Sequence, residues 1–287
     1  MTGTRGAAEP GDKGCDLLEG QTVIVTGAGG SGVATGICEA VQASGGQLVL
    51  NDLDDTAVAA ALQRYPGAIG VVADVSDPED AERLVAIATA RFGPVTGLVN
   101  NAGVGLAKRF YEASPDQFER LFAVDVRGMW LVSKSFATAL IDCHLPGAIV
   151  NVSSVHSRAT MDYYALYSAA KAAVDGFTRG CAVELGGNGI RCNSIAPGYV
   201  DSQQNPGLLA TLTSDPEGWV EHHRMVEQPL QRLVEPADCG WLTVFLLSQR
   251  SQSITGQTVY VDGGLSARLY NWDTFDLLRP SRASAVR

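Results

Sequence analysis

Residues 22–52 read TVIVTGAGGSGVATGICEAVQASGGQLVLND, and this stretch decides the fold. It holds two apolar runs rich in branched side chains, TVIV (22–25) and QLVL (47–50), separated by a glycine-rich turn and a segment with helical periodicity. Strands that are apolar throughout are buried on both faces, which is typical of a parallel sheet covered by helices. The stretch therefore predicts a strand–helix–strand unit with parallel strands.

The same alternation continues to the end of the chain. Five further runs follow, with helical stretches between them: IGVV (69–72), GLVN (97–100), AIVNV (148–152), IRCNSI (190–195) and TVYV (258–261). The pattern predicts an α/β fold with a doubly wound, Rossmann-type, parallel seven-stranded sheet. Because no composition break divides the chain, we expect one domain over residues 19–287, preceded by a disordered tail at residues 1–18 that is rich in glycine, proline and charge.

Composition and charge exclude several classes of protein. The 287 residues are 46% hydrophobic, yet no apolar run is long enough to cross a bilayer. A formal net charge of −10 argues against nucleic acid and anionic membrane surfaces as partners. The six cysteines form no CxxC pair, which favours reduced thiols, predicts no metal site, and fits a cytoplasmic location.

The glycine turn predicts a nucleotide cofactor. Four glycines (Gly27, Gly29, Gly30 and Gly32) precede a helix, and a glycine turn lets a diphosphate approach the free N–H groups of such a helix start. Asp52 follows the second run, 25 residues after Gly27, where an acid accepts the adenosine ribose hydroxyls. A carboxylate repels a 2′-phosphate, and no Arg or Lys lies between Gly20 and Arg64, so we expect NAD(H) rather than NADP(H). The alternative is that Asp52 only caps a loop.

In these features the chain resembles the short-chain dehydrogenase/reductase family over residues 20–264. The matching motifs, in chain order, are Asp74-Val75, the NNAG turn Asn100–Gly103, Ser154, the YxxxK pair Tyr167 and Lys171, Pro197-Gly198 followed by Ser202, and the closing YVDGG (260–264). The resemblance implies a cofactor site built from Gly27, Gly30, Ser31, Gly32, Val33, Asp52, Leu53, Asp74, Val75, Asn101, Ala102, Gly103, Tyr167, Lys171, Pro197, Gly198, Val200 and Ser202. The glycine turn departs from the family pattern by one inserted residue and by Ala34 in place of the third glycine.

The candidate catalytic residues are Ser154, Tyr167 and Lys171. Tyr167 and Lys171 are four residues apart in a stretch that favours helix, so they share one helix face. A free phenol has a pKa of about 10, and a nearby ammonium stabilises its deprotonated form. Ser154 follows the fifth run, at the edge where such sheets bind ligands, and its hydroxyl can bond the substrate oxygen. Ser153 is the alternative hydroxyl.

Asp125 stands where the family commonly has asparagine. The family resemblance implies that the asparagine helps to hold a water that links the lysine to solvent. An ionised aspartate accepts hydrogen bonds but cannot donate them. It would stabilise Lys171 as a cation while its own charge opposes tyrosinate formation, so we expect an altered pH dependence of catalysis rather than an inactive enzyme.

Two regions are expected to set substrate specificity. The first runs from His156 to Tyr164, although a rim histidine without a role is the equal alternative for His156. The second is residues 203–230, the family's lid, and with it Tyr199 and Trp219 are expected to contact substrate. The aromatic lid favours a medium to large, partly apolar substrate.

The leading hypothesis is an NAD(H)-dependent oxidoreductase that interconverts an alcohol and a carbonyl group, or a carbonyl-like imine or hemiaminal, of a small molecule. The alternatives are a 3-oxoacyl-carrier-protein reductase, which the net negative charge disfavours, and a catalytically silent NAD-binding sensor or scaffold. The resemblance also implies a homodimer or homotetramer. The C-terminal extension, residues 265–287, would then pack on a neighbouring subunit, because its apolar side chains Leu269, Tyr270, Trp272 and Phe275 would otherwise form an exposed cluster.

Overall fold

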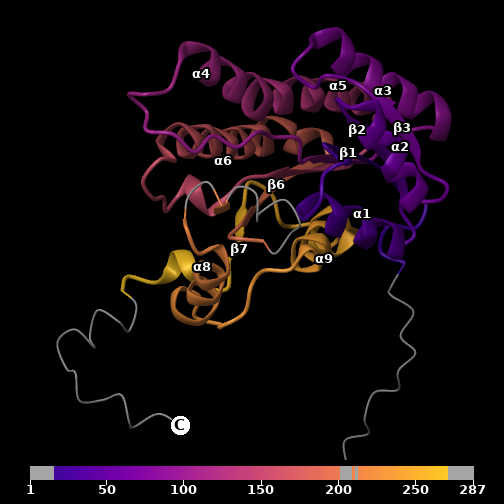
Figure 1. The fold of residues 1–287 in the computed structure, drawn as a ribbon. Helices are drawn as coiled ribbons and strands as arrows, with labels where there is room; N and C mark the ends of the chain where they lie inside the picture. The colour runs from indigo at the N-terminus through magenta and orange to yellow at the C-terminus, as the bar shows by residue number, and fades with distance from the viewer. Residues whose placement is uncertain (1–15, 201–208, 211–212, 271–287) are drawn as a thin grey trace, which may run out of the picture.

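The computed structural model describes residues 16–200, 209–210 and 213–270, and places seven parallel strands in one sheet (Figure 1). The order in the sheet is β3-β2-β1-β4-β5-β6-β7, so the chain winds outward in both directions from β1 and β4. The strands are β1 (Thr22–Thr26), β2 (Gln47–Asp52), β3 (Ile69–Val72), β4 (Gly97–Asn100), β5 (Gly147–Val152), β6 (Ile190–Pro197) and β7 (Thr258–Val261). The predicted doubly wound, single-domain α/β fold is confirmed.

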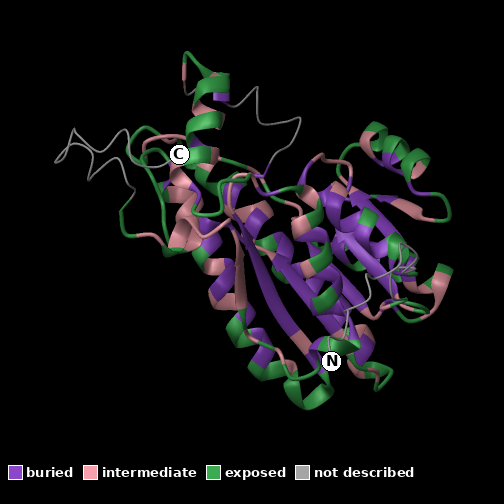
Figure 2. Cartoon of the chain, turned by 90° about the horizontal axis from the view of Figure 1, so that it is seen from below, coloured by how far each residue is buried: buried purple, intermediate pink, exposed green. Residues whose placement is uncertain are grey.

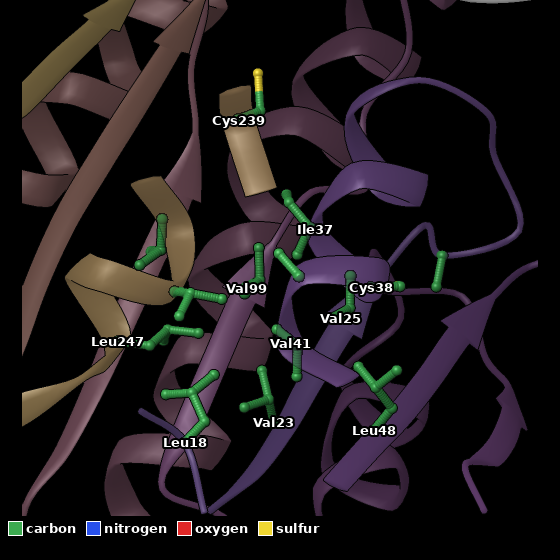
Figure 3. Close-up of a cluster of buried hydrophobic side chains, with 14 of the residues drawn as sticks. Leu18, Val23, Val25, Ile37, Cys38, Val41, Leu48, Val99, Cys239 and Leu247 are labelled. Atoms are coloured by element: carbon green, nitrogen blue, oxygen red, sulfur yellow. The ribbon is translucent and has the colours of Figure 1, made fainter. Parts of the chain in front are cut away.

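Helices cover both faces of the sheet, and the buried strands run between them (Figure 2). On one face α1 (Val33–Ala43) and α9 (Pro236–Leu247) pack on one apolar cluster, part of which is drawn in Figure 3. On the other face a second cluster joins α3 (Pro78–Phe92), α5 (Met129–Asp142) and α6 (Ala165–Leu185). The central strands are buried on both sides because their side chains alternate between the two clusters, whereas the edge strands β3 and β7 are only partly buried.

Shorter elements complete the described chain. They are α2 (Asp55–Arg64), α4 (Pro115–Phe122), a π-helical turn at Ala123–Gly128, a 3-10 turn at Val155–Ser157, α8 (Pro216–His222) and a second π-helical turn at His223–Glu227. The first π-helical turn leads into α5, and such turns inside helices are frequent at functional sites.

Glycines set the approach of α1 to α9. A side chain on Gly36 would collide with the backbone of Pro236, and one on Gly240 would collide with the backbone of Gly36. The close approach here is therefore between two helices. Ala34, which replaces the third glycine of the family pattern, is buried in α1.

The disordered N-terminal tail was predicted to extend through residue 18, and this boundary lies too far along the chain. Leu18 is fully buried, and its N–H donates to the carbonyl of Ser44 at 2.9 Å. An apolar side chain in the core holds this part of the chain on the domain. Residues 1–15, the first part of the expected lid and most of the C-terminal extension lie outside the described residues.

Candidate functional site

The glycine turn between β1 and α1 has the shape that a diphosphate needs. Gly27 has φ +63°, and a Cβ there would lie 2.8 Å from the Cα of Ala102. Gly32, with φ +79°, begins α1 without a side-chain cap, which leaves the N–H groups of the first turn for a ligand. In the described part of the chain the buried Ser31 hydroxyl has no hydrogen-bond partner. These groups fit a nicotinamide dinucleotide, so Gly27, Ser31, Gly32 and Val33 remain the predicted diphosphate site.

The NNAG motif supports this turn from the neighbouring strand. The Asn101 amide donates to the carbonyls of Thr26 at 2.9 Å and Gly27 at 3.2 Å. The Thr26 hydroxyl accepts the N–H groups of Asn101 and Ala102 at 3.0 Å each. Asn101 therefore fixes the position of the turn, whereas the sequence predicts it only as a cofactor contact.

Asp52 lies at the carboxyl end of β2 and reaches the glycine turn. Its Oδ2 accepts the N–H of Gly29 at 3.0 Å, and its Oδ1 accepts the N–H groups of Leu53 at 2.8 Å and Asp54 at 3.3 Å. The loop-capping alternative is therefore correct in part. Each carboxylate oxygen can accept more than one hydrogen bond, so the group can also take ribose hydroxyls.

On the adenine side, Asp74 and Val75 follow β3. Asp74 Oδ1 accepts the N–H and the hydroxyl of Ser76 at 2.8 and 2.7 Å, which turns this carboxylate toward its own loop. Val75 is buried, and a Cβ on Gly128 would lie 2.8 Å from its Cγ2. The backbone of this loop is held as well, since the N–H of Asp74 donates to Asp80 Oδ2 at 2.8 Å and the carbonyl of Asp74 accepts the N–H of Asp77 at 3.0 Å.

Tyr167 and Lys171 lie one turn apart on α6, and the Lys171 side chain is buried against Asp125. Lys171 Nζ is 3.0 Å from Asp125 Oδ2, 3.2 Å from the carbonyl oxygen of Val152, and 5.5 Å from the centre of the Tyr167 ring. Burial opposes the charge on Lys171, but the negative groups Tyr167, Asp125 and Asp175 outweigh it and raise the pKa of Lys171. The ion pair with Asp125 therefore favours the charged form of Lys171 beside the phenol.

The second carboxylate oxygen of Asp125 also has a hydrogen-bond partner, which fixes the side chain. Asp125 lies in the π-helical turn before α5, its side chain is fully buried, and its Oδ1 accepts the N–H of Val104 at 2.7 Å. A Cβ on Gly103 would lie 3.1 Å from Asp125 Oδ2 and 3.4 Å from Lys171 Nζ. Gly103 thus leaves room for the ion pair, a role different from the predicted cofactor contact.

The two candidate serines have different environments. The buried Ser153 hydroxyl donates to the backbone carbonyl of Lys171 at 3.3 Å. The Ser154 hydroxyl accepts the N–H of His156 at 3.3 Å and keeps its own proton to donate. Because the turn at Val155–Ser157 packs against both α6 and β6, Ser154 lies at the same sheet edge as Tyr167. This arrangement favours Ser154 over Ser153.

Aromatic rings stand around this edge in two groups. His156 stacks on Tyr164, with ring centres 4.5 Å apart, and Tyr167 meets His156 edge-on. Beyond β6, Trp219 stacks on His223, and Tyr199 meets both edge-on. The predicted substrate residues thus fall into two clusters. His223 was not predicted to contact substrate, although its spacing of four residues from Trp219 is a usable signal. Pro197 and Gly198 end β6, the buried Val200 bridges to Val234, and Ser202 lies outside the described residues.

Two further features were not predicted from the sequence. A buried chain of side-chain hydrogen bonds joins Ser133, Asn100, Asn151 and Thr178 beneath the site, with distances of 2.8–2.9 Å. Asp175, one helical turn after Lys171, is buried and accepts a hydrogen bond from Ser194 at 3.3 Å. The i, i+4 spacing from Lys171 could have indicated Asp175, whereas nothing local marks the asparagine pair.

The ion pair predicts a specific pH effect. Replacing Asp125 with asparagine removes a buried negative charge, which makes loss of a proton easier for the groups around it. We expect the midpoint of the pH–rate profile for alcohol oxidation to move to lower pH by about one unit. Asp116→Asn, which removes an exposed carboxylate on α4, is the matched control. A profile of the Asp125 variant that overlays the wild type would contradict this expectation.

Comparison with known proteins places the chain among oxidoreductases. A family model described as enoyl-(acyl carrier protein) reductase matches residues 27–266. The chain is 34% identical over 254 residues to 2-(S)-hydroxypropyl-CoM dehydrogenase 3 of Xanthobacter autotrophicus, covering 87% of this chain and 98% of that protein. It is 35% identical over 250 residues to carbonyl reductase [NADPH] 2 of Sus scrofa, covering 87% and 98%.

The fold of a solved enzyme matches as well. The crystal structure of levodione reductase superposes with a TM-score of 0.81 at 31% identity, covering 88% of this chain and 100% of that one. Among the described helices, none is long and apolar enough to span a membrane. The described residues also contain no group of three His, Cys, Asp or Glu side chains placed to hold a metal ion.

Proposed function

The chain belongs to the short-chain dehydrogenase/reductase family of oxidoreductases, and we propose that it uses NAD(H) to interconvert a carbonyl group and an alcohol of a medium-to-large metabolite. The observation that carries the proposal is the buried Lys171–Asp125 pair beneath Tyr167, at the sheet edge that holds Ser154. A buried cation beside a phenol stabilises its deprotonated form, which helps the phenol to give up and take back a proton during the reaction. A carbonyl-like imine or hemiaminal would fit the same groups.

Each residue has one task in this proposal. The nicotinamide supplies or accepts the hydride when it is bound. Tyr167 gives a proton to the substrate oxygen during reduction and takes it back during oxidation. Ser154 donates a hydrogen bond to the same oxygen as charge develops there. Lys171 stabilises the deprotonated phenol by its charge, and Asp125 and the Val152 carbonyl fix the position of its ammonium.

Asp52 supports the choice of NAD(H). Its carboxylate is anchored to the glycine turn and to its own loop, so it cannot move far when a cofactor binds. A 2′-phosphate would have to lie against this fixed negative charge, with Asp54 and Asp55 close in sequence. Because a relative of the chain is named for NADPH, the cofactor preference needs its own measurement.

Titration of NADH and NADPH by fluorescence tests the cofactor. We expect wild type to bind NADH at least tenfold more tightly than NADPH, which corresponds to about 1.4 kcal/mol. Asp52→Ala should lose most of this preference, because the substitution removes both the charge that repels the 2′-phosphate and the oxygens that accept the ribose hydroxyls. Asp55→Ala, the first residue of α2, serves as the control for the loss of one charge nearby. Equal binding of both cofactors by wild type would refute the proposal.

The two alternatives have less support. A carrier-protein reductase would dock an acidic partner, and this chain has a net charge of −10. A silent NAD-binding scaffold would have no need of the buried lysine beneath Tyr167, which is costly to bury. Turnover that depends on Tyr167 separates a scaffold from an enzyme.

We also propose that the protein assembles as a homodimer or homotetramer. Trp130 on α5 is 46% exposed and Trp241 on α9 is 50% exposed, and Phe245 lies one turn after Trp241. The two helices lie on opposite faces of the sheet, and β7 is one of its edge strands. Exposed apolar groups on helix faces favour an interface. Light scattering at micromolar concentration should report a dimer or larger. A monomer at that concentration would argue against an interface here.

A further inference from the structure

The carboxyl edge of the sheet carries two stacked pairs of aromatic rings. His156 and Tyr164 are nearly parallel, at 20°, and Trp219 and His223 are closer to parallel still, at 9° with ring centres 4.9 Å apart. A tyrosine stands edge-on to each pair: Tyr167 to the first and Tyr199 to the second. The first pair follows β5 and the second is packed on the residue that follows β6, and these strands are neighbours.

The second group belongs to the lid rather than to the sheet. Trp219 is on α8 and His223 begins the π-helical turn after it, so both lie on one side of this segment. The charged residues of the segment bind one another on the outside: Arg224 pairs with Glu221 at 2.7 Å, and His222 with Glu227 at 3.3 Å. The aromatic side of the lid therefore packs on Tyr199, at the end of β6.

Both histidines are uncharged members of these stacks. Burial lowers the pKa of His156, and it also lowers the pKa of His223, beyond what Glu227 restores. His223 Nε2 lies 3.3 Å from the amide nitrogen of Gln228, which is fully buried, and Nδ1 of His156 lies 3.0 Å from the Thr160 hydroxyl. The basic side chains near this edge are also engaged, since Arg109 stacks on Tyr163 and Arg158 on Tyr260.

We propose that the two aromatic groups are opposite walls of the substrate site, and that they select an uncharged substrate that carries a flat, unsaturated ring. The inference rests on the proposed function and names its substrate class. Aromatic rings are stabilised by stacked or edge-on contact beyond the burial of their area. Trp219 is half-buried, so part of its ring is left for a ligand. The rings of the two walls carry no full charge to pair with an anionic substrate, and the net charge of −10 would repel it, although Arg109 and Arg158 lie at the rim of this edge.

Two ketones of matched size test the proposal. Benzylacetone and its cyclohexyl analogue differ only in whether the ring is flat, and the ring is insulated from the carbonyl group in both. The quantity compared is the ratio of kcat/KM for the aryl ketone to kcat/KM for the cyclohexyl ketone, with the preferred cofactor saturating. We expect a ratio well above one in wild type. Trp219→Leu and His223→Leu should each lower it about 3- to 10-fold, mainly through KM.

Controls separate recognition from folding. Trp219→Phe keeps an aromatic face and should retain most of the ratio. Phe92→Leu removes a ring at the carboxyl end of α3, remote from the catalytic edge, and should leave the ratio unchanged. Melting temperatures show which variants are folded. If either Trp219→Leu or His223→Leu is not folded, the other one is used for the comparison.

The outcomes distinguish this proposal from the proposed function. If both ketones are turned over and no variant changes the ratio, the proposal of aromatic walls is refuted and the proposed oxidoreductase function stands. If the protein binds cofactor but turns over neither ketone, the result counts against the proposed oxidoreductase. Direct binding of the two ketones to the cofactor-loaded protein then tests whether the aromatic groups recognise a flat ring. Preferred binding of benzylacetone that Trp219→Leu abolishes would support them, and equal or no binding would refute them.

Discussion

Replacing Tyr167 with phenylalanine is expected to lower kcat by about 10²–10⁴-fold, the range that a positioned proton donor contributes. Cofactor affinity should change by less than about threefold, because the Tyr167 hydroxyl is only one of the many contacts predicted for the dinucleotide and the glycine turn is left intact. Stability should also be kept: among the described residues the Tyr167 hydroxyl has no hydrogen-bond partner to leave unsatisfied, and the ring contacts with His156 and Tyr164 remain.

Comparing turnover with cofactor binding in this variant separates a role in proton transfer from a structural role. Steady-state rates and NADH titrations are measured on the same preparation, and Tyr111→Phe, on an exposed tyrosine, is the control for losing a phenol hydroxyl. Turnover by Tyr167→Phe within tenfold of wild type would remove Tyr167 from the proton path. Loss of both binding and turnover would instead indicate a structural role.

The second large effect concerns the stability of the ion pair. In Lys171→Met the carboxylate of Asp125 stays fully buried without its partner, and breaking a buried pair in this way costs about 3–5 kcal/mol of the free energy of unfolding.

A double variant separates the buried charge from the lost lysine. Asp125→Asn keeps an oxygen that can accept the N–H of Val104, so Lys171→Met with Asp125→Asn should recover most of the stability. Urea denaturation of wild type, the two single variants and the double variant at one protein concentration gives the coupling energy between the two positions. A double variant as unstable as Lys171→Met alone would show that the cost comes from packing and not from charge. Neither protein that carries Lys171→Met should recover normal turnover, because both lack the cation.

Local patterns were sufficient for the framework of this protein. The seven apolar runs, with their spacing, predicted strands whose observed bounds differ by at most a few residues, because burial on both faces leaves a continuous apolar signature in the sequence. The glycines at 27 and 32 lie at positive φ, as a turn into a helix requires. The i, i+4 spacing placed Tyr167 and Lys171 on one face of α6 because helix geometry is fixed.

The tertiary structure decided what these residues touch. Asp125 is marked in the sequence as unusual, but its bond to Val104 and the space left by Gly103 depend on how the turn after β4 folds against a π-helical turn. The collision that requires Gly36 and Gly240 joins residues about 200 positions apart. Periodicity and spacing report only the face of an element on which a residue lies. The sequence predicted that Asp125 acts on Lys171, and the spacing of Trp219 and His223 marked one helix face. Which element covers each face is settled by packing, and that is why the 3.0 Å contact of the ion pair, the approach of α1 to α9 and the packing of the Trp219–His223 stack on Tyr199 needed the three-dimensional structure.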